Sequence, residues 1–182
     1  MTKMNLSAPL PFVGQKRMFA KEFIKVLDQF PDDTVFVDLF GGSGLLSHIT
    51  KRMKPTSTVV YNDFDNYRFR LAHIPHTNKL LADIRTLVGD SVPKHKAIKG
   101  KLRECVLKRI EEEEASVGYV DFITLSSSLM FSMKYKLSVE EMSKEVLYNN
   151  IRKNGYPESL DYLEGLEIVS CDYKEVYNQY KD

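Results

Sequence analysis

Thr34-Val-Phe-Val-Asp-Leu-Phe-Gly-Gly-Ser-Gly44 is the stretch on which the fold of this 182-residue chain depends. Residues Thr34 to Leu39 are mostly β-branched or apolar, which predicts a buried strand. Glycines follow at once, and apolar residues then recur at helical spacing as far as Met53, just before Pro55. The stretch therefore predicts a strand, a glycine turn and a helix in direct succession.

The glycine turn has the composition of a ligand-binding loop. Gly41, Gly42 and Gly44 let the backbone approach a ligand closely, and the start of the helix offers N–H groups. Asp38, at the end of the strand, suits an amino-bearing or cationic ligand better than a pyrophosphate. The loop also lacks the Gly-x4-Gly-Lys-[Ser/Thr] pattern that cradles phosphate. These features favour S-adenosylmethionine, whose methionyl ammonium needs an acceptor; the alternative is a tight turn that binds nothing.

A second strand is predicted from Thr58 to Tyr61, and Asn62-Asp63-Phe64-Asp65 follows it. Doubly wound nucleotide-binding folds place a carboxylate on the ribose hydroxyls at this strand end. Asp63 is the better candidate because it lies nearer the strand. An Asx turn or a helix cap at either aspartate is the alternative interpretation.

The segment Leu10-Pro-Phe-Val-Gly-Gln-Lys16 precedes a predicted helix that ends at Pro31. Lys16 has two interpretations, a solvated charge or a cation that binds a ligand carboxylate. The apolar face of this helix is predicted to hold Phe19, Phe23, Val26, Leu27 and Phe30.

A third strand is predicted from Leu166 to Ser170, followed by Asp172 and a last helix that contains Tyr173 and Tyr180. The mostly helical segment between it and the second strand is far longer than an ordinary connection, so an inserted helical subdomain is expected. The predicted helices in this region lie at 68–74, along Leu80–Val88, along Ile98–Ile110, at 119–133, from Ser138 (with Glu141 as a capping box) to Leu147, and at 159–164.

A basic segment lies within the insertion. It contains Lys94, Lys96, Lys99, Lys101 and Arg103, followed by the acidic run 111–114. Such a pattern is typical of a solvated helix, and contact with DNA phosphates is the functional alternative.

The numbers of charged residues and cysteines exclude some classes of protein and favour others. Lys and Arg number 26 against 25 Asp and Glu, a formal charge of +1, so the chain as a whole is not a strongly basic nucleic-acid binder. Cys105 and Cys171 lie far apart, which favours a reduced, cytoplasmic setting. We expect neither a signal peptide nor a membrane-spanning helix.

Three patterns in fixed order carry a resemblance: Pro11-Phe-Val-Gly-Gln-Lys16, Val37-Asp-Leu-Phe-Gly-Gly-Ser-Gly44 and Tyr61-Asn-Asp-Phe-Asp65. Together they resemble the amino-terminal half of Dam-like adenine-N6-specific DNA methyltransferases, although Gln15 replaces a glycine of the first motif. The resemblance implies an α/β fold: a partial Rossmann-like, S-adenosylmethionine-dependent methyltransferase sheet with strand order 3-2-1 and a helical target-recognition insertion. The domains are then 1–78 with 165–182, and 79–164.

The resemblance also implies roles for individual residues in binding S-adenosylmethionine and double-stranded DNA. The basic segment and the helices around it would approach DNA. The cofactor residues would be Lys16 with the backbone near Phe12 and Gly14 at the methionyl carboxylate, Asp38 and Gly41 at the methionine part, Gly42 and Gly44 in the same loop, Asp63 at the ribose, Phe64 beside the adenine, and Asp172 at the adenine amino group.

One family motif is absent. The seven prolines include no adjacent pair, so the chain has no Asp-Pro-Pro-Tyr, the motif that grips the target adenine. We therefore expect a truncated or split methyltransferase that is inactive alone. The first strand would be a sheet edge, covered by a second copy of the chain, a separate carboxyl-terminal polypeptide or a rearranged terminus. The alternatives are a non-catalytic remnant that binds cofactor or DNA, and an unrelated helical protein.

Overall fold

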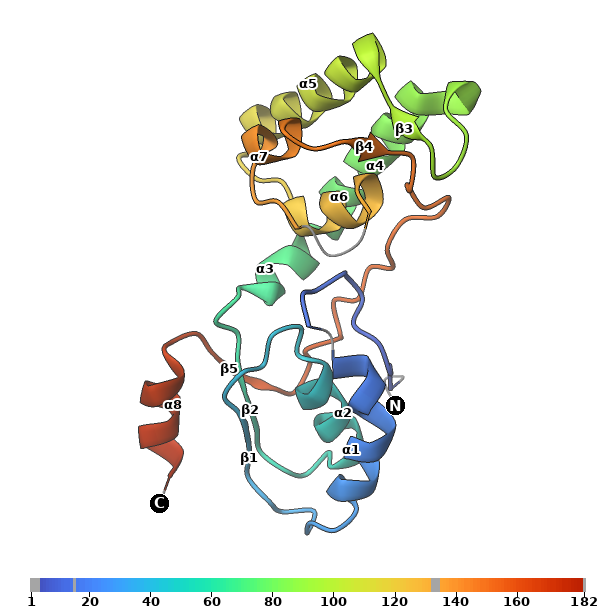
Figure 1. Cartoon of the computed structure of the whole chain (residues 1–182). Helices are drawn as coiled ribbons and strands as arrows, with labels where there is room; N and C mark the ends of the chain where they lie inside the picture. The colour runs from blue at the N-terminus through green and yellow to red at the C-terminus, as the bar shows by residue number, and fades with distance from the viewer. Residues whose placement is uncertain (1–3, 15, 132–134, 182) are drawn as a thin grey trace. The chain divides into compact units, whose positions relative to one another are not determined.

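The computed structural model describes residues 4–14, 16–131 and 135–181 (Figure 1). The chain divides into two compact units, Met1–Ala72 with Glu158–Asp182, and His73–Pro157. The domain boundaries drawn from the sequence, 1–78 with 165–182 and 79–164, stay a prediction about functional domains. Gln15 and Met133 lie outside the described residues.

The first unit is built on a parallel sheet. Its strands are β1 (Phe36–Asp38), β2 (Val59–Asn62) and β5 (Glu167–Val169), in the order β1-β2-β5. Asp38 pairs with Tyr61, and Asn62 pairs with Val169, so the carboxyl ends of all three strands meet at one edge of the sheet. The three predicted strands are thus parallel neighbours in the predicted order.

Burial differs sharply between the central strand and the first. All four residues of β2 are buried, whereas those of β1 are only half-buried. Beside β1, Val35 is 55% and Phe40 63% exposed. The buried strand predicted at 34–39 is confirmed as a strand, but it is shorter and less buried than expected. Among the described residues, β1 has a neighbour on one side only.

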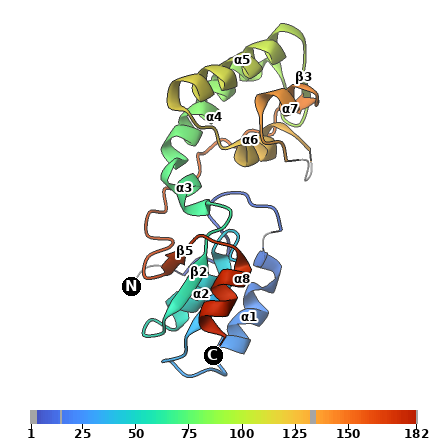
Figure 2. The same cartoon turned by 90° about the vertical axis from the view of Figure 1, so that its left-hand side faces the viewer.

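Helices cover both faces of this sheet. The helix α8 (Tyr173–Tyr180) lies on one face, and α1 (Ala20–Leu27) and α2 (Leu45–Met53) lie on the other (Figures 1 and 2). The predicted helix up to Met53 is confirmed, as is the last helix. The 3₁₀ turn η1 (Lys16–Phe19) leads into α1, and α3 (Tyr67–Ala72) follows β2.

The apolar face of α1 differs from the prediction. Ala20 and Leu27 join Leu45 and Ile49 of α2 in a core cluster, with Phe23 and Ile24 against it. The remaining three residues of the predicted face are exposed: Phe19, Val26 and Phe30. The predicted helix at 159–164 is also wrong, since that segment forms turns.

The second unit contains α4 (Ile74–Val88), η2 (Gly89–Ser91), β3 (Ala97–Ile98), α5 (Gly100–Val117), α6 (Phe122–Leu129), α7 (Val139–Ser143) and β4 (Leu147–Tyr148). Its sheet pairs β3 with β4 antiparallel, which the sequence did not predict, and Leu147 belongs to β4 rather than to a helix. The predicted capping box is only half formed: Ser138 Oγ accepts from the Glu141 N–H, but the Glu141 carboxylate accepts from the Leu137 N–H rather than from that of Ser138.

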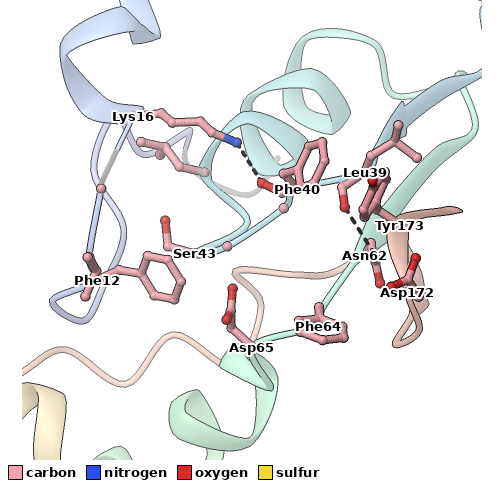
Figure 3. Close-up of a pocket in the computed structure, with 15 residues that line it drawn as sticks. Phe12, Lys16, Leu39, Phe40, Ser43, Asn62, Phe64, Asp65, Asp172 and Tyr173 are labelled. Carbon is pink, nitrogen blue, oxygen red and sulfur yellow. Dashed lines mark hydrogen bonds between the residues drawn. The ribbon is translucent and has the colours of Figure 1, made fainter. Parts of the chain in front are cut away.

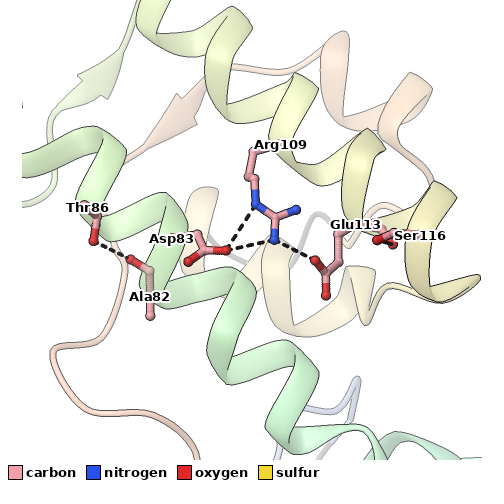
Figure 4. A network of polar contacts seen from close by, with 6 residues as sticks. All are labelled: Ala82, Asp83, Thr86, Arg109, Glu113 and Ser116. Carbon is pink, nitrogen blue, oxygen red and sulfur yellow. Dashed lines mark hydrogen bonds and ion pairs between the residues drawn. The ribbon is translucent and has the colours of Figure 1, made fainter.

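An arginine joins the two long helices of this unit. From α5, Arg109 donates to Asp83 of α4 over 3.1 and 2.8 Å, and to Glu113 over 2.6 Å (Figure 4). Glu113 is 4% exposed. Since a buried carboxylate is costly without a partner, the guanidinium stabilises the α4–α5 pair. No helix in the described part of the chain has the length and hydropathy needed to cross a membrane.

In the first unit, a buried histidine holds the turn at Tyr162. The Asn5 N–H donates to His48 Nε2 over 3.0 Å, and His48 Nδ1 lies 2.7 Å from the Tyr162 carbonyl oxygen. Because Nε2 accepts, the proton is on Nδ1, which donates to Tyr162. The two rings stack at 4.5 Å. Burial lowers the pKa of His48 below its ordinary value of 6.5.

We predict that this histidine makes the first unit sensitive to acid. The unfolded chain binds a proton near pH 6.5 and the folded chain only at lower pH, so the contribution of His48 is complete above 6.5 and is lost as pH falls through the lower folded pKa. Urea unfolding at a series of pH values measures this. His48→Gln should flatten the acid decline, whereas His76→Gln, at an exposed histidine, should leave it unchanged. An equal decline in both variants would contradict the prediction.

Candidate functional site

A cavity of about 400 Å³ lies at the carboxyl ends of the three parallel strands, within the first unit (Figure 3). Ligand sites in open α/β sheets occur at this edge. The segment from Gly41 to Gly44, here called the glycine loop, forms one wall of the cavity with its backbone. Residues that follow β2 and β5 form another wall. The lining residues are Phe12, Val13, Gly14, Lys16, Leu39, Phe40, Gly41, Gly42, Ser43, Leu45, Asn62, Phe64, Asp65, Asp172 and Tyr173.

The glycine loop is glycine-rich first of all for packing. A Cβ on Gly41 would lie 2.3 Å from the ring of Tyr61, and one on Gly42 would lie 2.9 Å from Phe12. Gly44 is the N-cap of α2, at φ 66°, and does not line the cavity, unlike Gly41 and Gly42. The sequence offered two interpretations of these glycines, a tight strand-to-helix turn and a ligand-binding loop. The same segment can serve as both.

Lys16 and Asp38 form an ion pair beside the glycine loop, but only Lys16 lines the cavity. Lys16 Nζ donates to the Phe40 carbonyl oxygen over 2.7 Å and lies 4.0 Å from Asp38 Oδ1. Asp38 Oδ2 accepts from Ser47 Oγ over 2.8 Å, and Asp38 does not line the cavity. The Lys16 ammonium is thus the cation of the site, while the Asp38 carboxylate braces α2.

The two aspartates after β2 have separate roles. Asp63 is 4% exposed and accepts from the backbone N–H groups of Tyr67, over 2.5 Å, and Arg68, over 3.0 Å. It therefore caps α3, which is the alternative that the sequence left open. Asp65 lines the cavity instead (Figure 3). This geometry favours Asp65 over Asp63 as the carboxylate that meets a ligand.

Aromatic side chains make up much of the wall. The rings of Phe40 and Tyr173 lie 5.0 Å apart, and Phe64 is 66% exposed. Asp172 also lines the cavity, and its Oδ1 accepts from the Lys174 N–H over 2.8 Å at the start of α8. The sequence predicted Phe12, Phe64 and Asp172 as site residues, and all three line the cavity. It missed Phe40, which follows the first predicted strand directly, and Tyr173, which comes shortly after the third.

The predicted basic segment divides into two groups. Lys94 Nζ donates to the Ile151 carbonyl oxygen over 2.6 Å, and Arg103 donates to the backbone of Ser143 and Glu145. These two cations therefore hold the second unit together. The ammonium groups of the other three are exposed and bind no described residue: Lys96, Lys99 and Lys101. Within the described ranges, no group of His, Cys, Asp or Glu is arranged to hold a metal ion.

Comparison with known proteins gives two matches. Residues 12–144 match the model of a family described as D12 class N6 adenine-specific DNA methyltransferase. A Haemophilus influenzae protein named "Putative methyltransferase" is 38% identical over 179 residues, which are 96% of this chain and 60% of the relative. The chain thus spans about three fifths of the length of this curated relative. No solved structure matches the chain.

Proposed function

Because the chain belongs to the D12 class N6 adenine-specific DNA methyltransferase family, we propose that it binds S-adenosylmethionine in the strand-end cavity and serves methyl transfer to adenine N6 in double-stranded DNA. The observation that carries this proposal is the cavity itself, with a glycine loop, one cation and two carboxylates around it. We further propose that the three strands belong to a Rossmann-like methyltransferase sheet.

The lining residues fit this cofactor. The cavity of about 400 Å³ is in the range of small-molecule sites. Lys16 would bind the methionyl carboxylate, and Asp65 and Asp172 would accept from ribose hydroxyls and amino groups. Phe40, Phe64 and Tyr173 present aromatic faces, which suit both an adenine ring and a sulfonium cation. The bound cofactor would supply the methyl group.

We predict that the two aspartates after β2 separate binding from folding. Asp65→Ala should weaken S-adenosylmethionine binding about tenfold or more with little change in melting temperature, because it removes an exposed acceptor. Asp63→Ala should instead lower the free energy of unfolding by about 1–3 kcal/mol, since it uncaps α3. Isothermal titration calorimetry and thermal unfolding measure the two effects. Normal binding by Asp65→Ala would reject this assignment, and no binding by the wild-type chain would reject the site.

We also propose that the three exposed lysines contact DNA phosphates, whereas Lys94 and Arg103 act through the backbone they hold. Replacing Lys96, Lys99 and Lys101 by Glu should reduce affinity for a duplex about tenfold or more. It should also reduce the slope of log affinity against log salt by about one per lysine that contacts phosphate. Fluorescence anisotropy at several salt concentrations measures both. A control variant with Glu at Lys21, Lys25 and Lys181, on the first unit, changes the charge equally and should bind normally; an equal loss in both would contradict the assignment.

We propose that methyl transfer needs residues that this 182-residue chain does not contain. No Asp-Pro-Pro-Tyr occurs in the sequence, so we expect no methyl transfer by the chain alone. The same observation favours the second candidate function, a non-catalytic cofactor- or DNA-binding module. The two differ in whether a polypeptide that carries such a motif restores transfer.

We propose that the open side of β1 is covered by another strand, from a second copy of the chain or from a separate carboxyl-terminal polypeptide. Val35 and Phe40 are exposed beside a backbone edge that no described residue pairs with, which favours pairing with a further strand. In the absence of a second polypeptide, size-exclusion chromatography with light scattering should show a dimer at micromolar concentration. Val35→Lys should shift it toward monomer, whereas Leu160→Lys, at an exposed residue far from β1 in sequence, should not. A wild-type monomer would rule out self-pairing.

A further inference from the structure

The side chain of Asn62, the last residue of β2, joins the segments that follow β1 and β5 in the first unit. Its Nδ2 donates to the carbonyl oxygens of Leu39, over 3.1 Å, and Cys171, over 3.0 Å. Its Oδ1 accepts from the Cys171 N–H over 3.2 Å. Leu39 directly follows β1, and Cys171 lies just beyond β5. Asn62 is 1% exposed, so this amide works with little competition from water.

These contacts lie just beyond the paired strands. The ladder itself ends at Asp38–Tyr61 on one side and Asn62–Val169 on the other. The tip of β5 is also fastened by the Asp63 N–H, which donates to the Val169 carbonyl oxygen over 2.8 Å. The sheet therefore has its own hydrogen bonds, and the amide of Asn62 acts on the segments that leave it.

The two segments held by Asn62 form adjoining parts of the cavity wall, where the rings of Phe40 and Tyr173 lie 5.0 Å apart. Beyond Leu39 come Phe40 and the glycine loop, and beyond Cys171 come Asp172 and Tyr173 (Figure 3). In the proposed function, the first segment faces the methionine part of the cofactor and the second faces the adenosine part. The distance between them decides whether one elongated ligand can contact both at once.

We propose that Asn62 is a positioning residue that fixes the spacing between these two segments, so that both ends of one ligand bind together. This inference rests on the proposed binding of S-adenosylmethionine. A fixed spacing lowers the ordering cost of binding and makes contact at the second end effectively intramolecular. Loss of the spacing should therefore weaken a ligand that spans the cavity far more than a fragment that occupies one end.

The variant Asn62→Asp tests this with almost no change of shape. It keeps an acceptor for the Cys171 N–H, but it loses both donors and directs a negative charge at two carbonyl oxygens. Ligand-observed NMR on the full chain can compare S-adenosylmethionine with methionine and adenosine offered separately. We expect the affinity for the whole cofactor to fall about tenfold or more, with each fragment changed by less than about twofold.

The second unit offers a matched control. Asn78 Nδ2 donates to the Tyr156 carbonyl oxygen over 2.8 Å, and its Oδ1 accepts from the Tyr156 N–H over 2.7 Å. Asn78→Asp thus makes the same chemical change at a comparable pair of side-chain to backbone hydrogen bonds, with residues that do not line the cavity. It should destabilise its own unit and leave the ratio of whole-cofactor to fragment affinity at the wild-type value.

The possible results separate the two proposals. A wild-type chain that binds no S-adenosylmethionine overturns the proposed function and this inference with it. If the wild type binds, but Asn62→Asp weakens cofactor and fragments in equal proportion or weakens neither, only the inference fails. Asn62→Ala, which removes the amide without adding charge, should repeat the expected pattern. Failure of both variants to fold would also overturn the inference, because Asn62 would then be required for folding rather than for spacing.

Discussion

The ring of Tyr61 beneath the glycine loop is the constraint on which the rest of the first unit depends. Tyr61 is fully buried on the central strand, and its ring occupies the space that a Cβ on Gly41 would need, at 2.3 Å. The loop can therefore cross the tip of β2 only if residue 41 has no side chain. The Tyr61 hydroxyl then lies 2.7 Å from the Gly42 carbonyl oxygen and 2.9 Å from Asp63 Oδ1, and its single proton serves one of them at a time. Burial beside Asp63 raises the pKa of Tyr61, so the hydroxyl stays a neutral donor.

The packing of Tyr61 against Gly41 also determines the position of the cavity walls. The position of the loop fixes where α2 starts at Gly44 and where the Phe40 carbonyl oxygen meets Lys16. The hydroxyl of Tyr61 also approaches the carboxylate that caps α3, so the loop and the start of α3 share one buried contact. The cavity walls are thus parts of one packed arrangement rather than separate loops, which is the condition for a preorganised site.

Apart from the length and burial of β1, the sequence predicted the strands of this unit and the helix α2, because their signals are local and strong. The helix of α2 has regular apolar spacing between a glycine start and Pro55, and the three parallel strands are short apolar runs with polar residues at their ends. The pair β3–β4 has only two residues in each strand and joins Ala97 to Tyr148, which lie far apart in the sequence. No local sequence pattern therefore predicts this pair. For the same reason Leu147 resembled the last residue of an amphipathic helix.

The individual residues of the candidate site were harder to predict from the sequence than the segments of the chain that contain them. The strand-end rule directed attention to the segment after β2 but favoured Asp63, the aspartate nearer the strand, whereas Asp65 is the one that lines the cavity. That choice depends on where α3 begins, and Asn66 at φ 55° turns the chain so that the Asp63 carboxylate meets the first N–H groups of the helix. The basic segment divided in the same way, because Lys94 and Arg103 lie beside backbone that comes from residues far along the chain.

The two edges of the parallel sheet differ in a way that bears on what surrounds it. Around β5 the chain carries Glu167 and Ser170, and Glu167 is exposed, so this edge has the polar character of strands that stay unpaired. Around β1 the chain carries Val35 and Phe40, which are more than half exposed. A sheet that ended naturally on both sides would be expected to protect both edges. Only the β5 edge carries such polar residues, and this difference between the two edges supports the proposal that a further strand pairs with β1.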